Sequence, residues 1–141
     1  MYKANNSDAK EFKVSVVMPV YNAEKYVEEA VLSAVHLDEV GEIILIEDGS
    51  KDASLRVCED LAKNFDKITL LVHENNANKG ASGSRNIGIQ NAKFSYVSFL
   101  DADDVYAENR FIADAINFLE NPEIDGVYSA VGYLNEPDGK I

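Results

Sequence analysis

The sequence predicts an α/β fold in which a mainly parallel sheet is covered by helices on both faces, a three-layer αβα arrangement of the Rossmann-like kind. Short apolar runs rich in β-branched residues alternate with segments whose apolar residues recur at helical spacing, and only short breaks separate them. Such alternation builds right-handed βαβ units and hence parallel strands. With 141 residues, 46% of them hydrophobic, the chain is long enough to bury one core.

The first strand and helix lie near the N-terminus. Residues 14–18 are apolar and mostly β-branched, and Pro19 follows them, which suits a buried parallel strand. We predict that Asn22 caps the helix that follows. The apolar residues of that helix are spaced for one buried face: Tyr26, Val27, Ala30, Val31, Ala34 and Val35.

The remaining elements follow in the same alternation. We expect strands at residues 43–46, 68–72, 94–100 and 125–131. The intervening helices are expected after Asp52, around Ile87 and over residues 109–119, and residues 75–84 are expected to form a loop because they are rich in Asn, Gly and Ser. The single cysteine, Cys58, falls on the apolar face of the second helix, so we expect it to be a buried small side chain in a reducing compartment.

The two ends of the chain differ from its middle in composition. Residues 1–11 are polar and are expected to form a tail, while residues 12–141 are expected to form one domain. Residues 135–140 are rich in turn-forming residues. We interpret them as the turn of a hairpin cut as its second strand begins, which predicts that the chain is the N-terminal part of a longer protein.

Three polar segments follow predicted strands, at residues 19–22, 47–50 and 101–104. In open α/β sheets, ligands bind outside the carboxyl ends of the strands. We therefore expect these segments to converge on one site. If strand geometry continues to Asp103, the carboxylates of Asp101 and Asp103 point the same way, as two oxygen ligands suited to Mg2+ or Mn2+. The alternative is a solvated acidic turn, which we favour for Asp104.

The charge of the chain limits its partners. A net charge of −12 argues against a nucleic acid partner and means that a phosphate-bearing ligand would need a cation beside it. The sequence contains no apolar run long enough to span a membrane and no signal-peptide pattern near its start. His36 and His73, at a helix end and a strand end, are expected to be structural.

Four motifs carry a resemblance to a known family. They are residues 15–22 (SVVMPVYN), residues 42–50 (EIILIEDGS), residues 80–88 with Ser84-Arg85-Asn86, and residues 99–104 (FLDADD). In this order, each at its expected strand end, they resemble the nucleotide-sugar half of the family 2 glycosyltransferases, which have the GT-A fold. The resemblance covers the chain from about Phe12 to its end.

The resemblance implies which residues hold the nucleotide base. It places the Pro19 backbone and the Tyr21 ring against the base, where an aromatic ring contributes stacking. It makes Asp48 the acceptor for the imide N–H of uracil or thymine. Glu47 stands where the family usually has Asp, so we assign it no role.

The resemblance also implies a diphosphate and metal site. The loop containing Lys79 and Gly80 would approach the nucleotide, and Arg85 would oppose a phosphate or an acidic neighbour. Asp103 would be the direct ligand of Mn2+ or Mg2+, with Asp101 nearer the ribose or a metal-bound water.

The resemblance implies transfer of a hexosyl group from a UDP-sugar donor to a saccharide or lipid-linked acceptor in polysaccharide biosynthesis. The reaction would depend on a metal ion and would invert the configuration at the anomeric carbon. The catalytic base is expected beyond Ile141, so this chain alone is expected to bind donor without transferring it. The expected location is the cytoplasm, with the full-length protein peripheral at the inner face of the membrane.

Three other functions fit part of the pattern. A haloacid-dehalogenase-like phosphatase would use Asp101 as nucleophile and Asp103 as acid/base, but few residues follow for its remaining motifs. A receiver-like signalling domain would carry its acidic pair after the first strand, where this chain has residues 19–22. A non-catalytic nucleotide-binding module is the third alternative.

Overall fold

The computed structural model describes residues 12–128 and 131–132. The elements are β1 (Val14–Val20), α1 (Val27–Val35), β2 (Val40–Glu47), α2 (Ser54–Asn64), β3 (Ile68–Val72), the short 3-10 helix η1 (Glu74–Asn76), α3 (Gly80–Asn91), β4 (Tyr96–Phe99) and α4 (Ile112–Glu120). They form two compact units: the first ends at Glu108 and holds the sheet, and the second begins at Asn109 and holds α4. The expectation of a single domain over residues 12–141 stays a prediction.

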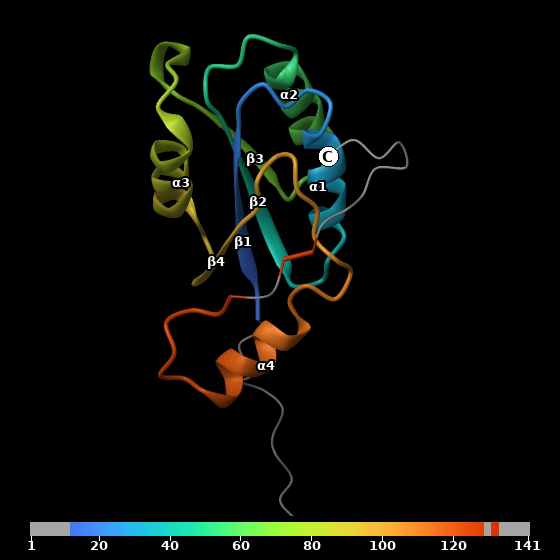
Figure 1. The fold of residues 1–141 in the computed structure, drawn as a ribbon, viewed down its shortest axis with the longest axis vertical. Coiled ribbons are helices and arrows are strands. Elements are labelled where there is room, and N and C mark those ends of the chain that lie inside the picture. The colour runs from blue at the N-terminus through green and yellow to red at the C-terminus, as the bar shows by residue number, and fades with distance from the viewer. Residues whose placement is uncertain (1–11, 129–130, 133–141) are drawn as a thin grey trace, which may run out of the picture. The chain divides into compact units, whose positions relative to one another are not determined.

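The first unit is a three-layer α/β structure, as predicted. Its four strands are all parallel and lie in the order β3-β2-β1-β4. Helices α1 and α2 cover one face of the sheet, and α3 covers the other (Figure 1). In the described part of the chain, no helix has the length and apolar character needed to cross a membrane.

Strand β1 lies in the middle of the sheet and forms the centre of the core. Val17 is fully buried and packs with Ile44 and Ile46 of β2. Pro19 lies inside this strand, although it has no N–H to donate. The Val17 carbonyl accepts from Leu100 on the β4 side, so the Pro19 nitrogen faces that same side, beyond the last residue that pairs with β4. Every hydrogen bond that β1 makes to its neighbouring strands is therefore compatible with proline at this position.

Gly88 allows α3 to lie close to the sheet. A Cβ atom at this position would lie 2.3 Å from Cγ1 of Val17 and 3.1 Å from Cδ1 of Ile46. Only a residue without a side chain fits between the helix and the two buried strands. The position of α3 matters for function, because the helix begins at the end of the sheet where the polar strand ends gather.

Replacing Gly88 with alanine is expected to destabilise the fold. Crowding in a packed core costs about 1–3 kcal/mol, which exceeds the gain of roughly 1 kcal/mol or less in helix propensity. Urea unfolding of the variant and the wild type measures the difference. Gly126→Ala is the control, because no atom lies within 4 Å of the Cβ position there. An unchanged unfolding midpoint for Gly88→Ala would contradict this packing.

A buried carboxylate at the other end of the sheet holds the start of β4. Oε1 of Glu42 accepts hydrogen bonds from the Ser15 hydroxyl (2.7 Å) and the Lys93 N–H (2.6 Å), and the Phe94 N–H donates to Ser15 Oγ (3.1 Å). Burial raises the pKa of Glu42, but hydrogen bonds from Lys93 and Ser15 outweigh it and hold the pKa below its ordinary value. This network connects β1, β2 and the segment between α3 and β4, and so holds the chain where β4 begins.

The predicted burial of Cys58 on α2 is confirmed. Burial, together with the nearby carboxylates of Glu47, Asp52 and Glu59, raises the pKa of its thiol to about 12. At neutral pH the side chain is an uncharged part of the core.

Three predicted boundaries are wrong. Asn22 does not cap α1, which begins at Val27 after Tyr26; Asn22 adopts φ 48 in the preceding loop. The loop expected over residues 75–84 ends earlier, because Gly80, with φ 77, allows the chain to turn directly into α3. The fourth strand covers only Tyr96–Phe99, because β4 pairs with β1 over four residues.

The predicted fifth strand is also wrong where the structure describes it. Residues 125–128 have no strand conformation, and residues 129–130 lie outside the described residues. Gly126 has low strand propensity, and Tyr128 is 97% exposed. A strand without a hydrogen-bonding partner is not stable, and no partner for these residues lies in the described sheet. The predicted turn at residues 135–140 lies outside the described residues as well.

Candidate functional site

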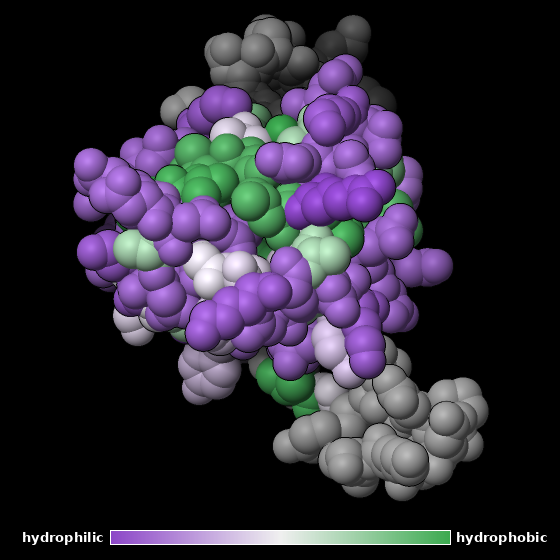
Figure 2. Space-filling model, turned by 90° about the horizontal axis from the view of Figure 1, so that it is seen from above, coloured by the Kyte–Doolittle hydropathy of each residue, from purple (hydrophilic) through white to green (hydrophobic). Residues whose placement is uncertain are grey.

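A cavity of about 470 Å³ opens at the carboxyl edge of the sheet. The residues that line it come from the ends of β1, β2 and β4 and from the start of α3: Pro19, Tyr21, Asn22, Ala23, Tyr26, Asp48, Asn78, Gly80, Ala81, Arg85, Asp101, Ala102 and Asp103. The predicted convergence of the three polar segments is confirmed. Figure 2 looks onto this end of the molecule and shows apolar surface near the middle with hydrophilic side chains around it.

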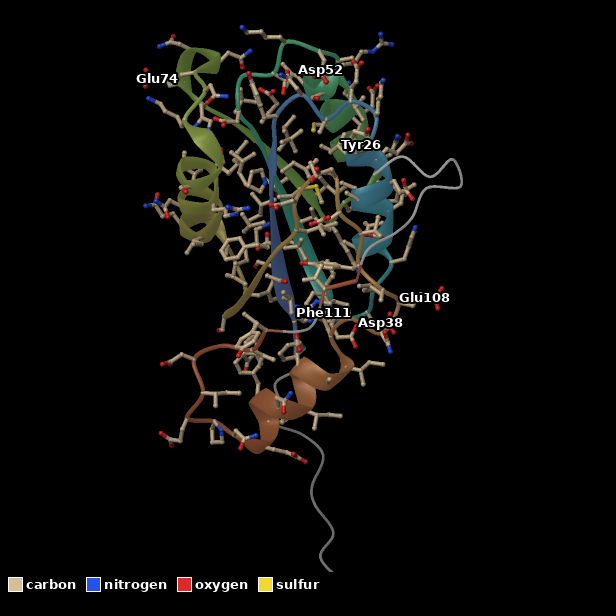
Figure 3. The ribbon with its side chains drawn as sticks, viewed as in Figure 1. Tyr26, Asp38, Asp52, Glu74, Glu108 and Phe111 are labelled. Atoms are coloured by element: carbon tan, nitrogen blue, oxygen red, sulfur yellow. The ribbon has the colours of Figure 1, made fainter. Side chains whose placement is uncertain are left out.

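The loops after β1 and β2 are held together by reciprocal hydrogen bonds. The Asn22 N–H donates to Ser50 Oγ (3.0 Å), and Oδ1 of Asn22 accepts from the Lys51 N–H (2.8 Å). The Ala23 N–H donates to Ser54 Oγ at the start of α2 (2.8 Å). Figure 3 places Tyr26 and Asp52 at this end of the molecule and Asp38 at the other. The walls of the cavity are therefore fixed by contacts between segments distant in sequence.

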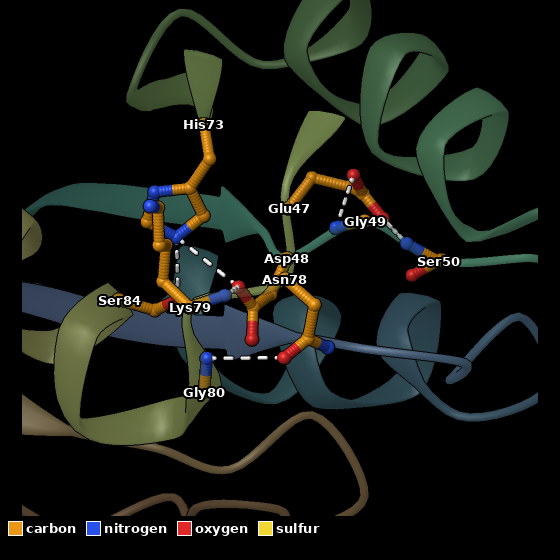
Figure 4. A network of polar contacts seen from close by, with 9 residues as sticks. All are labelled: Glu47, Asp48, Gly49, Ser50, His73, Asn78, Lys79, Gly80 and Ser84. Carbon is orange, nitrogen blue, oxygen red and sulfur yellow. Dashed lines mark hydrogen bonds and ion pairs between the residues drawn. The ribbon is translucent and has the colours of Figure 1, made fainter. Parts of the chain in front are cut away.

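Glu47 supports the second of these loops and does not line the cavity. Its side chain is fully buried and folds back, so that its two oxygens accept from the Gly49 N–H (3.1 Å) and the Ser50 N–H (2.6 Å) (Figure 4). Gly49 has φ 72, and a Cβ there would lie 2.6 Å from the Asn76 carbonyl oxygen. The turn is thus closed from inside by Glu47 and packed tightly against η1. This structural role was not predicted from sequence.

Asp48 lies at the centre of a polar network (Figure 4). Its Oδ1 accepts the Lys79 N–H (2.6 Å) and lies 3.2 Å from Nε2 of His73, which in turn lies 2.9 Å from Ser84 Oγ. Asp48 is almost fully buried but still lines the cavity. Lys79, a predicted site residue, contributes through its backbone N–H, and its neighbours Asn78 and Gly80 line the wall.

Arg85 and Asp101 form an ion pair across the cavity wall. Nη2 of Arg85 donates to Oδ1 of Asp101 at 2.6 Å, and the guanidinium lies 5.9 Å from the centre of the Phe99 ring. Both charged side chains are partly exposed and line the cavity. Of the two contacts predicted for Arg85, the structure shows the one with an acidic neighbour.

The acidic segment after β4 is a turn. β4 ends at Phe99, and the Asp104 N–H donates to the Asp101 carbonyl oxygen at 3.0 Å. The extended geometry predicted for Asp101 and Asp103 is therefore wrong, because β1 pairs with β4 only up to Phe99. Both carboxylates nevertheless line the cavity, on either side of the buried Ala102. Partial burial raises the pKa of Asp104, and the charges of Asp103 and Asp101 raise it further.

The chain after this turn is anchored by Tyr106. Its hydroxyl donates to the Phe99 carbonyl oxygen (2.9 Å) and lies 2.7 Å from Ser98 Oγ, while its N–H donates to Ser33 Oγ on α1 (3.0 Å). The turn is thereby held at both ends, by β4 before it and by α1 after it.

Comparison with known proteins identifies the family. Residues 15–140 match the family described as Glycosyl transferase family 2. The chain belongs to this family. The family-level prediction made from the four motifs is confirmed, and membership leaves the phosphatase and receiver-domain alternatives without support.

Curated relatives agree with this assignment. An uncharacterized glycosyltransferase of Haemophilus influenzae is 35% identical over 107 residues, which are 75% of this chain and 42% of that protein. The glycosyltransferase GlyG of Streptococcus pneumoniae is 33% identical over 129 residues, covering 91% and 42%. The minor teichoic acid biosynthesis protein GgaB of Bacillus subtilis is 33% identical over 119 residues, covering 82% and 13%. The chain spans less than half the length of these relatives.

Solved structures agree on the fold. TarS of S. aureus (residues 1–349), in complex with UDP, superposes with a TM-score of 0.68 at 25% identity, covering 87% of this chain and 38% of that one. The mannosyltransferase PcManGT of Pyrobaculum calidifontis, in complex with GDP-Man and Mn2+, gives a TM-score of 0.68 at 22% identity, covering 79% and 33%. The GT-A fold predicted for this family 2 chain is confirmed.

The acidic turn suits a metal ion that is coordinated partly by the protein and partly by a bound substrate. Among the described residues, no group of three or more His, Cys, Asp or Glu side chains forms a ready-made metal site. Mg2+ is usually bound through one or two carboxylates, with water and substrate phosphates in its other positions. Asp101 and Asp103 supply two carboxylates on one cavity wall, which matches this mode. They would hold the ion together with a diphosphate.

Proposed function

We propose that this chain is the donor-binding part of a glycosyltransferase that uses a UDP-sugar with Mn2+ or Mg2+. The observation that carries the proposal is the position of Asp48. One of its carboxylate oxygens accepts the Lys79 N–H and lies 3.2 Å from Nε2 of His73. The residue lines the same cavity as two tyrosines and the acidic turn. The UDP complex of TarS, a neighbour in fold, supports the choice of nucleotide.

The base recognition rests on what a carboxylate accepts. Ionised Asp48 only accepts hydrogen bonds, and the N3–H of uracil donates one. Cytosine has no hydrogen on N3 and adenine has none on N1, so both would place a lone pair against the carboxylate. Guanine does present an N–H, which makes GDP the informative competitor. Pro19 and the half-exposed Tyr21 offer the apolar and aromatic surface that the base would contact.

The diphosphate would lie between Arg85 and the acidic turn. A net charge of −12 opposes binding of a phosphate ligand, and the guanidinium of Arg85 and a divalent cation on Asp103 and Asp101 would offset that repulsion. When bound, the ion supplies Lewis-acid stabilisation of the departing nucleoside diphosphate. Arg85 would exchange its contact with Asp101 for one with phosphate.

Transfer itself is proposed to require residues outside this chain. We propose an inverting hexosyl transfer to a saccharide or lipid-linked acceptor in polysaccharide biosynthesis, with the catalytic base beyond Ile141. The name of the relative GgaB, a minor teichoic acid biosynthesis protein, supports a cell-surface polymer as product. The chain alone would then bind donor without transferring it, and the whole protein would act in the cytoplasm, peripheral at the inner face of the membrane.

A panel of nucleoside diphosphates tests the proposal. UDP at 100 times its Kd is expected to stabilise the fold by ~2.7 kcal/mol, seen as a rise in melting temperature that is larger with Mn2+ than in EDTA. CDP and ADP at the same concentration should raise it little. A larger shift with GDP than with UDP would contradict the uracil assignment, and no shift with any nucleotide would contradict donor binding.

A further inference from the structure

His73 connects three elements of the fold behind the cavity. It follows the last residue of β3, and only 3% of its side chain is exposed. Its Nε2 lies 3.2 Å from Oδ1 of Asp48 after β2, and 2.9 Å from Oγ of Ser84 on α3. His73 does not line the cavity, so it acts on a ligand only through Asp48.

The contact with Asp48 determines where the imidazole carries its proton. A carboxylate oxygen has no hydrogen to donate, so an Nε2 atom without a hydrogen would place two lone pairs against each other at 3.2 Å. A proton on Nε2 avoids this repulsion, and the nitrogen then has two oxygens nearby, Ser84 Oγ at 2.9 Å and Asp48 Oδ1 at 3.2 Å. In this tautomer Ser84 Oγ accepts from the imidazole.

Two donors thus meet one oxygen of Asp48. The Lys79 N–H donates to Oδ1 at 2.6 Å, and Nε2 of His73 lies 3.2 Å from the same oxygen. Within the described part of the chain, Oδ2 has no hydrogen-bonding partner and is the atom left for a ligand. The carboxylate torsion of aspartate is broad, so a side chain held at Oδ1 from two directions is better oriented than one held from one.

We propose that His73 is a positioning residue for nucleotide recognition: its Nε2–H fixes the Asp48 carboxylate so that Oδ2 faces the N3–H of the uracil base. The proposal rests on the proposed function, because it assumes that UDP is the ligand. Lys79 also positions Asp48, but through its backbone N–H, which a substitution of the side chain leaves in place. The contact of His73 is made by its side chain, so a substitution can remove it.

A pair of amide substitutions tests the proposal. In His73→Gln the amide nitrogen lies the same number of bonds from Cβ as Nε2 does in histidine, so it still reaches Asp48. In His73→Asn the amide nitrogen lies as many bonds from Cβ as Nδ1 does in histidine, so it does not reach Asp48. UDP affinity, measured by calorimetry on the folded variants, is expected to fall ~10-fold for His73→Asn and by at most about 3-fold for His73→Gln. The loss should be equal in Mn2+ and in EDTA.

A double-mutant cycle separates positioning from a general structural role. In the Asp48→Ala background, the His73→Asn substitution is expected to cause no further loss of UDP affinity, because the carboxylate that it orients is gone. An undiminished loss in that background would overturn the proposal. Equal UDP affinity of His73→Asn and the wild type would overturn it too, while leaving UDP binding intact. Failure of the wild type to bind UDP would overturn the proposed function and this inference together.

A measurement on the wild type covers the case in which the variants fail to fold. Nitrogen-detected NMR of the His73 imidazole is expected to show a protonated Nε2, with a signal that moves when UDP is added. An Nε2 without a proton in the free protein would overturn the proposal.

Discussion

Replacing Asp48 with alanine is expected to weaken UDP binding by roughly 10- to 100-fold, the equivalent of a lost hydrogen bond to a charged group. The loss should be the same with Mn2+ and in EDTA, because Asp48 acts on the base and not on the diphosphate. Isothermal titration calorimetry under both conditions measures it.

Asp60→Ala is the matched control for Asp48→Ala. It also removes one negative charge, but from the exposed face of α2, where Lys63 is the partner of Asp60 among the residues that the structure describes. If a lower net negative charge were all that mattered for UDP, both variants would bind UDP slightly better than the wild type. Unchanged UDP affinity in Asp48→Ala would contradict the role of Asp48 in base recognition.

Replacing Asp103 with alanine is expected to remove the metal-dependent part of UDP binding. The residue is exposed, lines the cavity and is the proposed direct ligand of the ion, so the fold should stay intact. Titrations of UDP should then give the same Kd with Mn2+ as with EDTA, while the wild type binds more tightly with Mn2+. In EDTA the variant should bind UDP at least as well as the wild type, because one repelling charge is gone.

Asp104→Ala is the control for this second substitution. Asp104 belongs to the same turn and is also exposed, but it does not line the cavity. It should keep the difference between Mn2+ and EDTA. If Asp104→Ala lost the difference between Mn2+ and EDTA and Asp103→Ala kept it, the metal ligand would be Asp104 and the assignment to Asp103 would be wrong.

The strands and the location of the site could be predicted because both depend on local pattern and topology. Buried parallel strands read as continuous apolar runs, as β1 and β2 do, and topology alone brings the ends of parallel strands to one edge of the sheet. Pattern and topology predicted the three polar segments and the pair Asp101 and Asp103. The resemblance to family 2 singled out Pro19, Tyr21 and Asp48 within those segments, and all of these residues line the cavity.

The details that failed depend on contacts between distant residues. The hydrogen bond between Asn22 and Lys51 joins positions 29 apart in sequence, and that between Lys79 and Asp48 joins positions 31 apart. Asn22 is of a residue type that commonly caps helices, and the local sequence does not show that its side chain will accept from a neighbouring loop instead of its own helix. His73 could have been suspected only from its place at a strand end, next to a polar loop.

The predicted fifth strand failed for a related reason. An apolar pattern shows that a segment could form a strand, but not that a partner strand is present to pair with it. For Asp101 and Asp103 the turn was only the alternative interpretation, because the end of β4 is set by how far β1 pairs with it, which the pattern of β4 does not contain.

In the proposed mode of binding, this family 2 chain recognises a UDP donor through Asp48 and holds its diphosphate through a metal ion on Asp103. The most direct test is a crystal structure of the chain grown with UDP and Mn2+. We expect the uracil N3 atom within hydrogen-bonding distance of Asp48 Oδ2, and anomalous scattering from Mn2+ between the diphosphate and Asp103. A nucleotide bound with its base away from Asp48, or manganese density away from the acidic turn, would contradict it.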